Sequence, residues 1–199
     1  AKRLEARGWF SHLVQKRSPT RDILQVNFAT RSGTEFVVIG NHWPSRRGGG
    51  DSEPFRMMAG ETLAYFHERA RHYLGADTPV MVMGDFNADY HSGEFAALRS
   101  NGPYRQDPQP YARYHLHDAW HLFSDQEVTR PFTHYAGPQG SVLDYILVSD
   151  EFRSSSSFCL ADILRYQVID KHLVNPDYAI DGDSSDHALV ALSVTCRAG

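Results

Sequence analysis

The chain of 199 residues has the length of one domain, and its hydrophobic fraction of 41% is enough for a core and too high for a disordered chain. The net charge of −4 argues against a protein that coats nucleic acid through a large positive field. No apolar run approaches the roughly 20 residues of a membrane span, so we expect a soluble protein with one domain over residues 1–199.

The first half of the chain predicts a hairpin, a loop and a long helix. Strands are expected over 21–30 and 35–41 on either side of a Ser32-Gly33 turn, and the glycine-rich segment 46–52 is predicted to be a mobile loop. The helix is expected over 54–74, because proline occupies its first turn, apolar residues recur along it and a glycine follows as a stop.

The second half alternates short strands and short helices. Its expected elements, in chain order, are a strand over 79–84, a helix over 92–99, a loop over 101–110, a helix over 116–123, and strands over 142–149 and 188–195. Interleaved strands and helices of this kind predict an α/β or α+β fold in which helices cover the faces of a sheet.

The first residues of the chain and its two cysteines bear on where the protein begins and on its redox chemistry. The chain opens at Ala1 without methionine or an apolar leader, so we expect it not to begin where translation begins, and the compartment stays open. Cys159 and Cys196 are too few for a disulfide framework or a four-thiolate zinc site. They can form one bridge or stay as buried thiols, and we favour the thiols.

Polar residues gather where apolar strands begin or end. One strand leads into Asn41-His42, another leads into Asp85-Phe86-Asn87, and the last is preceded by Asp186-His187. Buried strands that end in polar residues bring those side chains to the rim of a sheet, where open α/β folds place their ligands. We therefore expect these segments, together with the strand that carries Asp144, to form one site.

Asp85 and Asn87 lie two residues apart at a strand end and can share one direction while Phe86 points into the core. A carboxylate there can orient or deprotonate a water, and an amide can donate to a phosphoryl oxygen. The same residues also fit an Asx turn that caps the next segment. Both interpretations stay open on these residues alone.

Asp144 lies inside an apolar strand, where an unpaired carboxylate would be costly, so a histidine or another cation is its natural partner. A structural aspartate bonded to backbone amides or to an arginine is equally consistent. His187 can exchange protons near neutral pH. Taken singly, however, His187 and His42 are more often structural residues at a strand end.

In four motifs, and in their order, the chain resembles the endonuclease/exonuclease/phosphatase superfamily, the fold of DNase I, exonuclease III and the neutral sphingomyelinases. The motifs are Asn41-His42-Trp43-Pro44-Ser45, Gly84-Asp85-Phe86-Asn87, Leu143-Asp144-Tyr145-Ile146 and Ser185-Asp186-His187. The resemblance implies a DNase I-like four-layer α/β/β/α sandwich. It also implies a phosphoesterase that depends on Mg²⁺ or Mn²⁺, the ions that hard oxygen ligands suit.

The resemblance implies catalytic roles for five residues, which are His187, Asp144, Asp85, Asn87 and His42. His187 would act as general base or contact the scissile phosphate, with Asp144 paired to its other ring nitrogen. Asp85 would align or activate the attacking water. Such hydrolysis uses no protein nucleophile, because a metal and fixed donors neutralise the developing charge while one water is aimed in line.

The resemblance also implies the roles of the other two catalytic residues, Asn87 and His42, and of the residues that bind substrate and metal. Asn87 would hold a phosphoryl oxygen, and His42 would stabilise charge on the phosphorane with Asn41 beside it at the substrate. Asp186 and Asp85 would hold the metal. Of the arginines that flank the glycine-rich loop, Arg46 is the one we expect to meet a phosphate; Arg47 and Arg56 fit that role or a solvated charged loop.

The chain departs from the family pattern at its start. Members carry an early asparagine and a Gln-Glu-like strand end upstream of the Asn-His motif, and that glutamate is their principal metal ligand. Neither is present here, and Glu5 lies too close to His42 in sequence to replace it. We therefore expect the C-terminal portion of the domain, an incomplete sandwich whose upstream strands are missing or lie on another polypeptide.

Two further groups carry weaker signals. His115, His117 and His121 include an i, i+4 pair that could bind zinc on a helix, although an incidental solvated cluster is favoured because no thiolate or HExxH pattern accompanies it. Trp43 and Tyr145 are predicted to pack in the core or at its rim.

The sequence thus predicts a metal-dependent hydrolase of phosphate esters, of the phosphodiesterase or nuclease type. The segment around Asp144 lacks the Trp-Cys-Asp-Arg pattern of the inositol phosphatases, which favours the nuclease-type members. Two alternatives stay open: a catalytically silent fragment or scaffold without the metal-binding glutamate, and a phosphomonoesterase that acts on a small molecule or a lipid head group.

Overall fold

The computed structural model describes residues 4–15, 20–99, 115–123, 129–136, 139–152, 165–169 and 185–194. The expected loop over 101–110 and the two cysteines, Cys159 and Cys196, lie outside the described residues.

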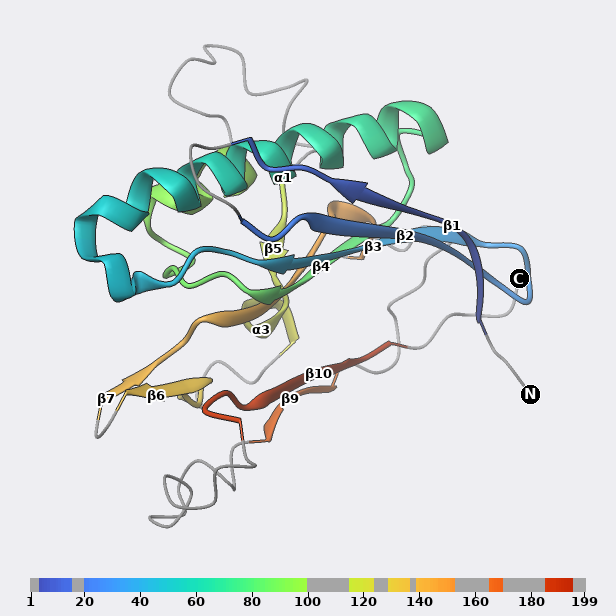
Figure 1. Cartoon of the computed structure of the whole chain (residues 1–199). Helices are drawn as coiled ribbons and strands as arrows, with labels where there is room; N and C mark the ends of the chain where they lie inside the picture. Colours follow the sequence, from blue (N-terminus) through green and yellow to red (C-terminus); the bar gives the residue numbers. More distant parts are fainter. Residues whose placement is uncertain are drawn as a thin grey trace.

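A six-stranded sheet carries the site (Figure 1). Its strands, in spatial order, are β1 (Leu4–His12), β2 (Ile23–Thr30), β3 (Glu35–His42), β4 (Val80–Asp85), β8 (Asp144–Val148) and β5 (His117–Asp118). Only β3 and β4 pair in parallel, and the other neighbours are antiparallel. The expected hairpin and the strands that precede Asp85 and contain Asp144 are confirmed.

Strand β1 is an element that the sequence did not predict. Seven of its nine residues are exposed, including Trp9 and Phe10, so its sequence has no alternation of buried and exposed positions. It is defined by antiparallel pairing with β2, which runs from Leu4 opposite Thr30 to His12 opposite Ile23. Pairing of this kind depends on the neighbouring strand and is not encoded in a local hydrophobic period.

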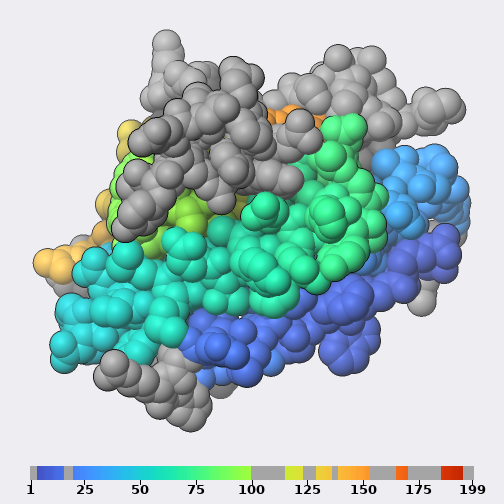
Figure 2. Space-filling view, turned by 90° about the horizontal axis from the view of Figure 1, so that it is seen from above, coloured from blue at the N-terminus to red at the C-terminus, as the bar shows by residue number. Residues whose placement is uncertain are grey.

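One long helix covers one face of the sheet. Helix α1 (Glu53–Leu74) has proline in its first turn and ends at Gly75, whose φ of +124° suits glycine. In Figure 2 this teal-to-green helix lies alongside the blue N-terminal strands. No helix within the described ranges, α1 included, combines the length and the apolar character of a membrane span.

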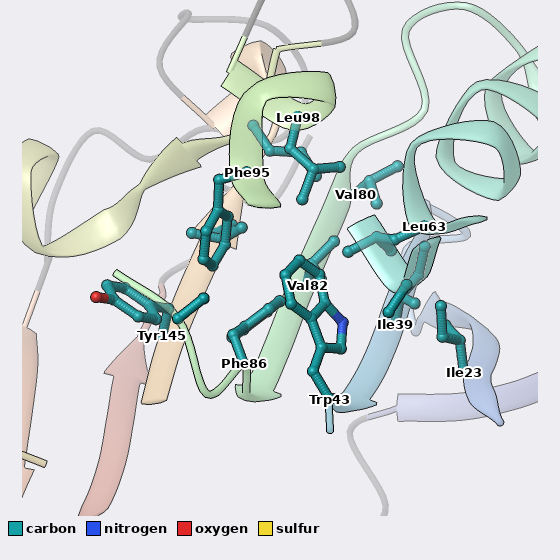
Figure 3. Close-up of a cluster of buried hydrophobic side chains, with 14 of the residues drawn as sticks. Ile23, Ile39, Trp43, Leu63, Val80, Val82, Phe86, Phe95, Leu98 and Tyr145 are labelled. Atoms are coloured by element: carbon teal, nitrogen blue, oxygen red, sulfur yellow. The ribbon is translucent and has the colours of Figure 1, made fainter. Parts of the chain in front are cut away.

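The core beneath α1 confirms the predicted packing of the aromatic residues near the motifs. Trp43 is 1% exposed and Phe86 is fully buried, and their rings meet edge to face with centroids 5.0 Å apart. Tyr145 lies on the other side of Phe86, and Phe95 of η2 (Gly93–Phe95) packs against all three rings (Figure 3). The next helix is α2 (Ala96–Arg99), so a helical segment follows as predicted for 92–99.

A second core lies on the opposite face of the sheet. Ile146 and Val148 of β8 are buried there with Tyr166 of strand β9 (Arg165–Ile169). Strand β9 pairs with β10 (Leu189–Ser193), and helix α3 (Ala119–Phe123) lies between this small sheet and the large one (Figure 1). The described residues therefore form a helical layer, a large sheet and a second β layer.

Two local predictions were wrong. The glycine-rich segment forms η1 (Arg46–Ser52), in which 3-10 turns lie on either side of a kink at Gly49, whose φ of +57° is not helical. The Ser45 side chain accepts a hydrogen bond from the Arg47 N–H, and the Ser52 hydroxyl donates to the Gly49 carbonyl. Within 116–123 only α3 is helical, because residues 117 and 118 pair with β8 as strand β5. A short hairpin of β6 (His134–Ala136) and β7 (Gln139–Ser141) was also not predicted.

Candidate active site at the ends of β3, β4 and β8

The sheet register brings three of the predicted residues into one row. His42 at the end of β3 is the partner of Asp85 in β4, and Asp85 is the partner of Asp144 in β8. Residues that pair across neighbouring strands have side chains close enough to interact. The register alone therefore gathers two acids and a histidine at one rim of the sheet.

A strained turn fixes the direction of Asp85. Gly84 has a φ of +137°, and a Cβ atom there would lie 1.9 Å from the Asn41 carbonyl oxygen. Asn87, two residues after Asp85, adopts a φ of +49°, and its N–H donates to Asp85 Oδ1 at 2.9 Å. The Asx turn considered from the sequence is therefore present, and it holds the carboxylate that also faces the site.

His187 joins this row through its Nδ1 atom. Nδ1 lies 2.8 Å from Asp144 Oδ2, so the buried-strand carboxylate has the histidine partner that the resemblance implied. The hydrogen bond to Asp144 raises the pKa of His187, against the opposing effect of burial. The other ring nitrogen, Nε2, lies 3.9 Å from Asp85 Oδ2.

Asp85 is the centre of the group. His42 Nε2 lies 3.4 Å from its Oδ2, and Asn87 Nδ2 donates to the same oxygen at 2.7 Å. Burial raises the pKa of Asp85, with a further contribution from nearby Asp144, while the Asn87 N–H opposes the shift. The pKa of His42 is lowered, first by burial and then by the charge of Arg21. The raised pKa of Asp85 brings its proton exchange closer to neutral pH, whereas the lowered pKa of His42 keeps that imidazole neutral there.

Thr133 supports both members of the His187–Asp144 pair, and sequence reasoning missed it. Its hydroxyl accepts hydrogen bonds from the N–H groups of Leu143 and Asp144, at 2.9 and 3.0 Å. Its carbonyl accepts from the Ala188 N–H at 2.7 Å, next to His187. The side chain is fully buried. A threonine outside regular structure has no sequence signal for such a role.

Arg130 was also missed. It pairs with the buried Asp118 through Nη1, and its Nη2 donates to the Asp144 carbonyl at 3.3 Å. Its guanidinium lies 4.6 Å from the centre of the Tyr145 ring, and Nη2 donates to the Tyr166 hydroxyl at 2.9 Å. This cation fixes the strand that carries Asp144 from behind the site.

The predicted substrate-binding residues have different surroundings. Asn41 is buried, and its Oδ1 accepts from the Trp43 indole at 3.1 Å, so it fixes the end of β3 from within the core. Arg46 is exposed, and its Nε donates to the Asn87 carbonyl at 2.8 Å, which ties η1 to the turn after β4. Arg56 is buried against Glu94 and Ser52, which corrects the suggestion that it meets a phosphate.

The described residues contain two groups that could hold a metal ion. The ligand atoms of Asp85, Asp144 and His187 all lie within 4.8 Å of one another, as do those of His134, Asp186 and His187. Asp85 Oδ2 and Asp186 Oδ1 lie 3.9 and 4.0 Å from the same atom, His187 Nε2. The two groups share His187, and carboxylate oxygens such as theirs are ligands that suit a divalent cation. His134 had not been singled out from the sequence.

The zinc cluster considered for the histidines near residue 117 does not form. His117 Nε2 is bonded to Asp150 Oδ1 at 2.7 Å, and His121 Nε2 lies 3.8 Å from Asp118 Oδ2. Since His117 belongs to β5 and His121 to α3, the helical i, i+4 spacing does not apply to them.

Three of the solved structures that are similar to this chain illustrate its relationships. The human Nocturnin catalytic domain with bound sulfate is 22% identical with a TM-score of 0.61, and the match covers 97% of this chain and 61% of that one. D. rerio TDP2 complexed with a single-strand DNA product is 16% identical, with a TM-score of 0.54 and coverage of 84% and 60%. The Bacteroides thetaiotaomicron mannosyl-6-phosphatase Bt3783 is 15% identical, with a TM-score of 0.55 and coverage of 97% and 67%.

These likenesses confirm the expected fold class. The chain spans less than two thirds of the length of the Nocturnin and TDP2 structures. No curated protein matches it. At the level of sequence, the Endonuclease/Exonuclease/phosphatase family matches residues 7–187. Because that match runs through all four motifs and the fold agrees with it, the chain belongs to the endonuclease/exonuclease/phosphatase family.

Proposed function

We propose that this chain carries the hydrolytic centre of a metal-dependent phosphodiesterase, with His187, Asp144 and Asp85 as its catalytic residues. The observation that supports this most is the chain of contacts from Asp144 Oδ2 through the His187 ring to Asp85 Oδ2, at 2.8 and 3.9 Å. Family membership supports the reaction class, since the family name covers nucleases and phosphatases.

In this proposal Asp144 holds the imidazole of His187 with its Nδ1 proton donated, which leaves Nε2 toward the substrate as the proton acceptor. Asp85 orients the attacking water, and its raised pKa suits proton exchange. His42, which is 46% exposed beside Asp85, donates a hydrogen bond to a phosphoryl oxygen. Asn87 holds the Asp85 carboxylate through its side-chain hydrogen bond. Arg46, at the start of η1, binds a phosphate of the substrate.

Asp85 and Asp186 would hold Mg²⁺ or Mn²⁺, since both present carboxylate oxygens near His187. The ion, when bound, supplies positive charge that stabilises the phosphorane. Asp186 is 52% exposed, so solvent can complete the coordination.

The substrate class is proposed as a phosphodiester of nucleic-acid type. TDP2 was solved with a single-strand DNA product, whereas Bt3783 is a mannosyl-6-phosphatase, so the fold serves both a nucleic acid and a sugar phosphate. The half-exposed His42 lies beside Asp85 and the exposed Arg46 beside the Asn87 carbonyl, and both side chains are accessible to a substrate that extends beyond the reacting phosphate. The net charge of −4 requires such contact to be local.

The test compares three substrates with Mg²⁺ or Mn²⁺: bis-p-nitrophenyl phosphate, p-nitrophenyl phosphate and supercoiled plasmid DNA. We expect diester hydrolysis and plasmid nicking that disappear with a chelator and return with the metal. His187→Ala is expected to lower the rate by about 10²-fold or more, while exposed His72→Gln on α1 leaves it unchanged. Equal rates for His187→Ala and the parent protein would overturn the proposal.

Calorimetric titration with Mg²⁺ separates this proposal from a silent scaffold. Saturable binding that Asp85→Asn weakens supports the hydrolytic centre. No binding together with no turnover would instead favour the silent fragment, and a preference for the monoester would favour a phosphomonoesterase.

A further inference from the structure

We propose that His134, Asp186 and His187 form a binding site for a zinc-like transition-metal ion, and that its occupation switches the hydrolytic centre off. The inhibition of hydrolysis rests on the proposed function, whereas the binding of the metal does not. His134 takes no part in the hydrolytic centre described above. Its neighbours Asp186 and His187, however, belong to the proposed hydrolytic centre.

The backbone places the two histidines side by side. His134 opens β6 and forms an antiparallel bridge with His187, which precedes β10. The bridge is continued by the hydrogen bond from the Ala188 N–H to the Thr133 carbonyl, at 2.7 Å. Partners across such a pair have their side chains on the same face, and the two imidazole centres lie 4.7 Å apart. The juxtaposition is therefore built into strand pairing.

The ligand atoms converge on one point. His134 Nε2 lies 3.6 Å from Asp186 Oδ2, and His187 Nε2 lies 4.0 Å from Asp186 Oδ1. All three residues can offer atoms within 4.8 Å of one another. Bound ligands on one zinc ion are separated by distances of this order, because each lies about 2 Å from the metal. Small rotations of three side chains would close the site.

The donor set selects the kind of ion. Two imidazole nitrogens and one carboxylate suit Zn²⁺ and its chemical relatives, whereas Mg²⁺ prefers an all-oxygen shell. Three protein ligands also leave the fourth tetrahedral position to water. The side chains of His134 and His187 are 19% and 27% exposed, and Asp186 is 52% exposed, so an ion has a path from solvent.

Asp144 supplies the outer support that such sites commonly have. A metal-bound histidine usually donates its second ring N–H to a carboxylate, which fixes the tautomer and strengthens the metal-binding nitrogen. His187 has this arrangement, with Nδ1 at 2.8 Å from Asp144 Oδ2. The carboxylate that prepares His187 for proton exchange therefore also prepares its Nε2 for a metal.

The two uses of His187 exclude each other. A transition metal on Nε2 occupies the lone pair that would accept a proton in hydrolysis, and it also takes Asp186 from the proposed Mg²⁺ site. Zinc is therefore expected to inhibit Mg²⁺-dependent hydrolysis without unfolding the protein. His134→Gln should remove this inhibition and keep the Mg²⁺-dependent rate.

Binding is tested first, without reference to activity. The protein is titrated with Co²⁺, whose visible absorption is intense in a tetrahedral site, and Zn²⁺ is then added in competition. We expect one Co²⁺ per chain with a tetrahedral spectrum, displaced by Zn²⁺. His134→Gln should weaken Zn²⁺ binding by about 100-fold or more, while His72→Gln, exposed on α1, should not change it.

The outcomes distinguish failure of the metal site from failure of the inhibition. No tetrahedral spectrum, or identical spectra and affinities for His134→Gln and the parent protein, would overturn the site. If the site binds zinc but Mg²⁺-dependent hydrolysis is absent from the parent protein, the failure belongs to the proposed function and overturns the switch alone. Zinc inhibition that His134→Gln does not relieve would also overturn the switch. Circular dichroism spectra of the variants check that each is folded.

Discussion

The hydroxyl of Thr133 accepts the N–H of Asp144 at 3.0 Å, although 11 residues separate them in the chain. The same hydroxyl accepts the Leu143 N–H, so it satisfies one buried and one half-buried backbone donor at the start of β8. The Thr133 carbonyl also accepts a hydrogen bond from the Ala188 N–H, next to His187. Thr133 therefore fixes the position of Asp144 relative to His187. The geometry of the pair thus depends on a residue that contacts neither reacting group directly.

Thr133→Val is therefore expected to impair both stability and activity. Valine keeps the shape but removes the acceptor of the buried Leu143 N–H, which costs about 1–3 kcal/mol, and of the half-buried Asp144 N–H, which costs less. Chemical denaturation measures the stability, and hydrolysis of bis-p-nitrophenyl phosphate measures kcat. Thr133→Ser, which retains the hydroxyl, should restore most of kcat. Equal kcat values for the valine variant and the parent protein would show that the bond does not position Asp144.

Gly84→Ala is expected to be strongly destabilising. A Cβ atom at this φ of +137° would lie 1.9 Å from the Asn41 carbonyl, so β3 and β4 must separate next to Asp85. Gly33→Ala is the matched control, because its φ is also positive but no atom lies within 4 Å of the added carbon. Backbone strain alone costs about 1–3 kcal/mol.

Thermal unfolding should show a larger decrease of Tm for Gly84→Ala than for Gly33→Ala, and a loss of activity for Gly84→Ala alone. Similar decreases of Tm would mean that the close approach of the two strands is not what requires glycine at position 84.

His67 is expected to make the fold sensitive to acid. Burial, together with the charge of Arg71, lowers the pKa of His67 from 6.5 to about 3, so the folded protein keeps this ring neutral where the unfolded chain protonates it. The unfolded state then binds one more proton, and the free energy of unfolding falls as the pH decreases from about 6.5 toward 3. The slope from this group is about 1.4 kcal/mol per pH unit.

Urea denaturation at several pH values checks this. His67→Leu should flatten the pH dependence between pH 6 and pH 4 by about that slope, whereas His72→Gln, exposed one turn later, should leave it unchanged. An unaltered slope in the leucine variant would assign the acid sensitivity to other groups.

The strand ends were the part of the site that could be predicted from sequence. Asp85 and Asp144 follow or lie within apolar runs whose strand character is local, and parallel pairing of β3 with β4 aligns His42 with Asp85. The histidine partner of Asp144 followed from the cost of an unpaired carboxylate in an apolar strand together with the family resemblance.

The supporting residues could not be predicted, because their roles arise from contacts between distant segments. Thr133 and Arg130 lie outside the strands and helices, and His134 belongs to a three-residue strand. Their partners are defined by the tertiary structure alone. For the same reason Arg56, expected either at a phosphate or in a solvated charged loop, is instead buried beside Glu94, which is 38 residues away in sequence.

A double-mutant cycle determines whether Asp144 and His187 act as one catalytic unit. Rates of Mg²⁺-dependent hydrolysis of bis-p-nitrophenyl phosphate are measured for the parent protein, Asp144→Asn, His187→Ala and the double variant. We expect each single change to lower kcat by about 10²–10⁴-fold and the double variant to be no slower than His187→Ala. Losses that multiply in the double variant would show that the two residues act independently and would contradict it.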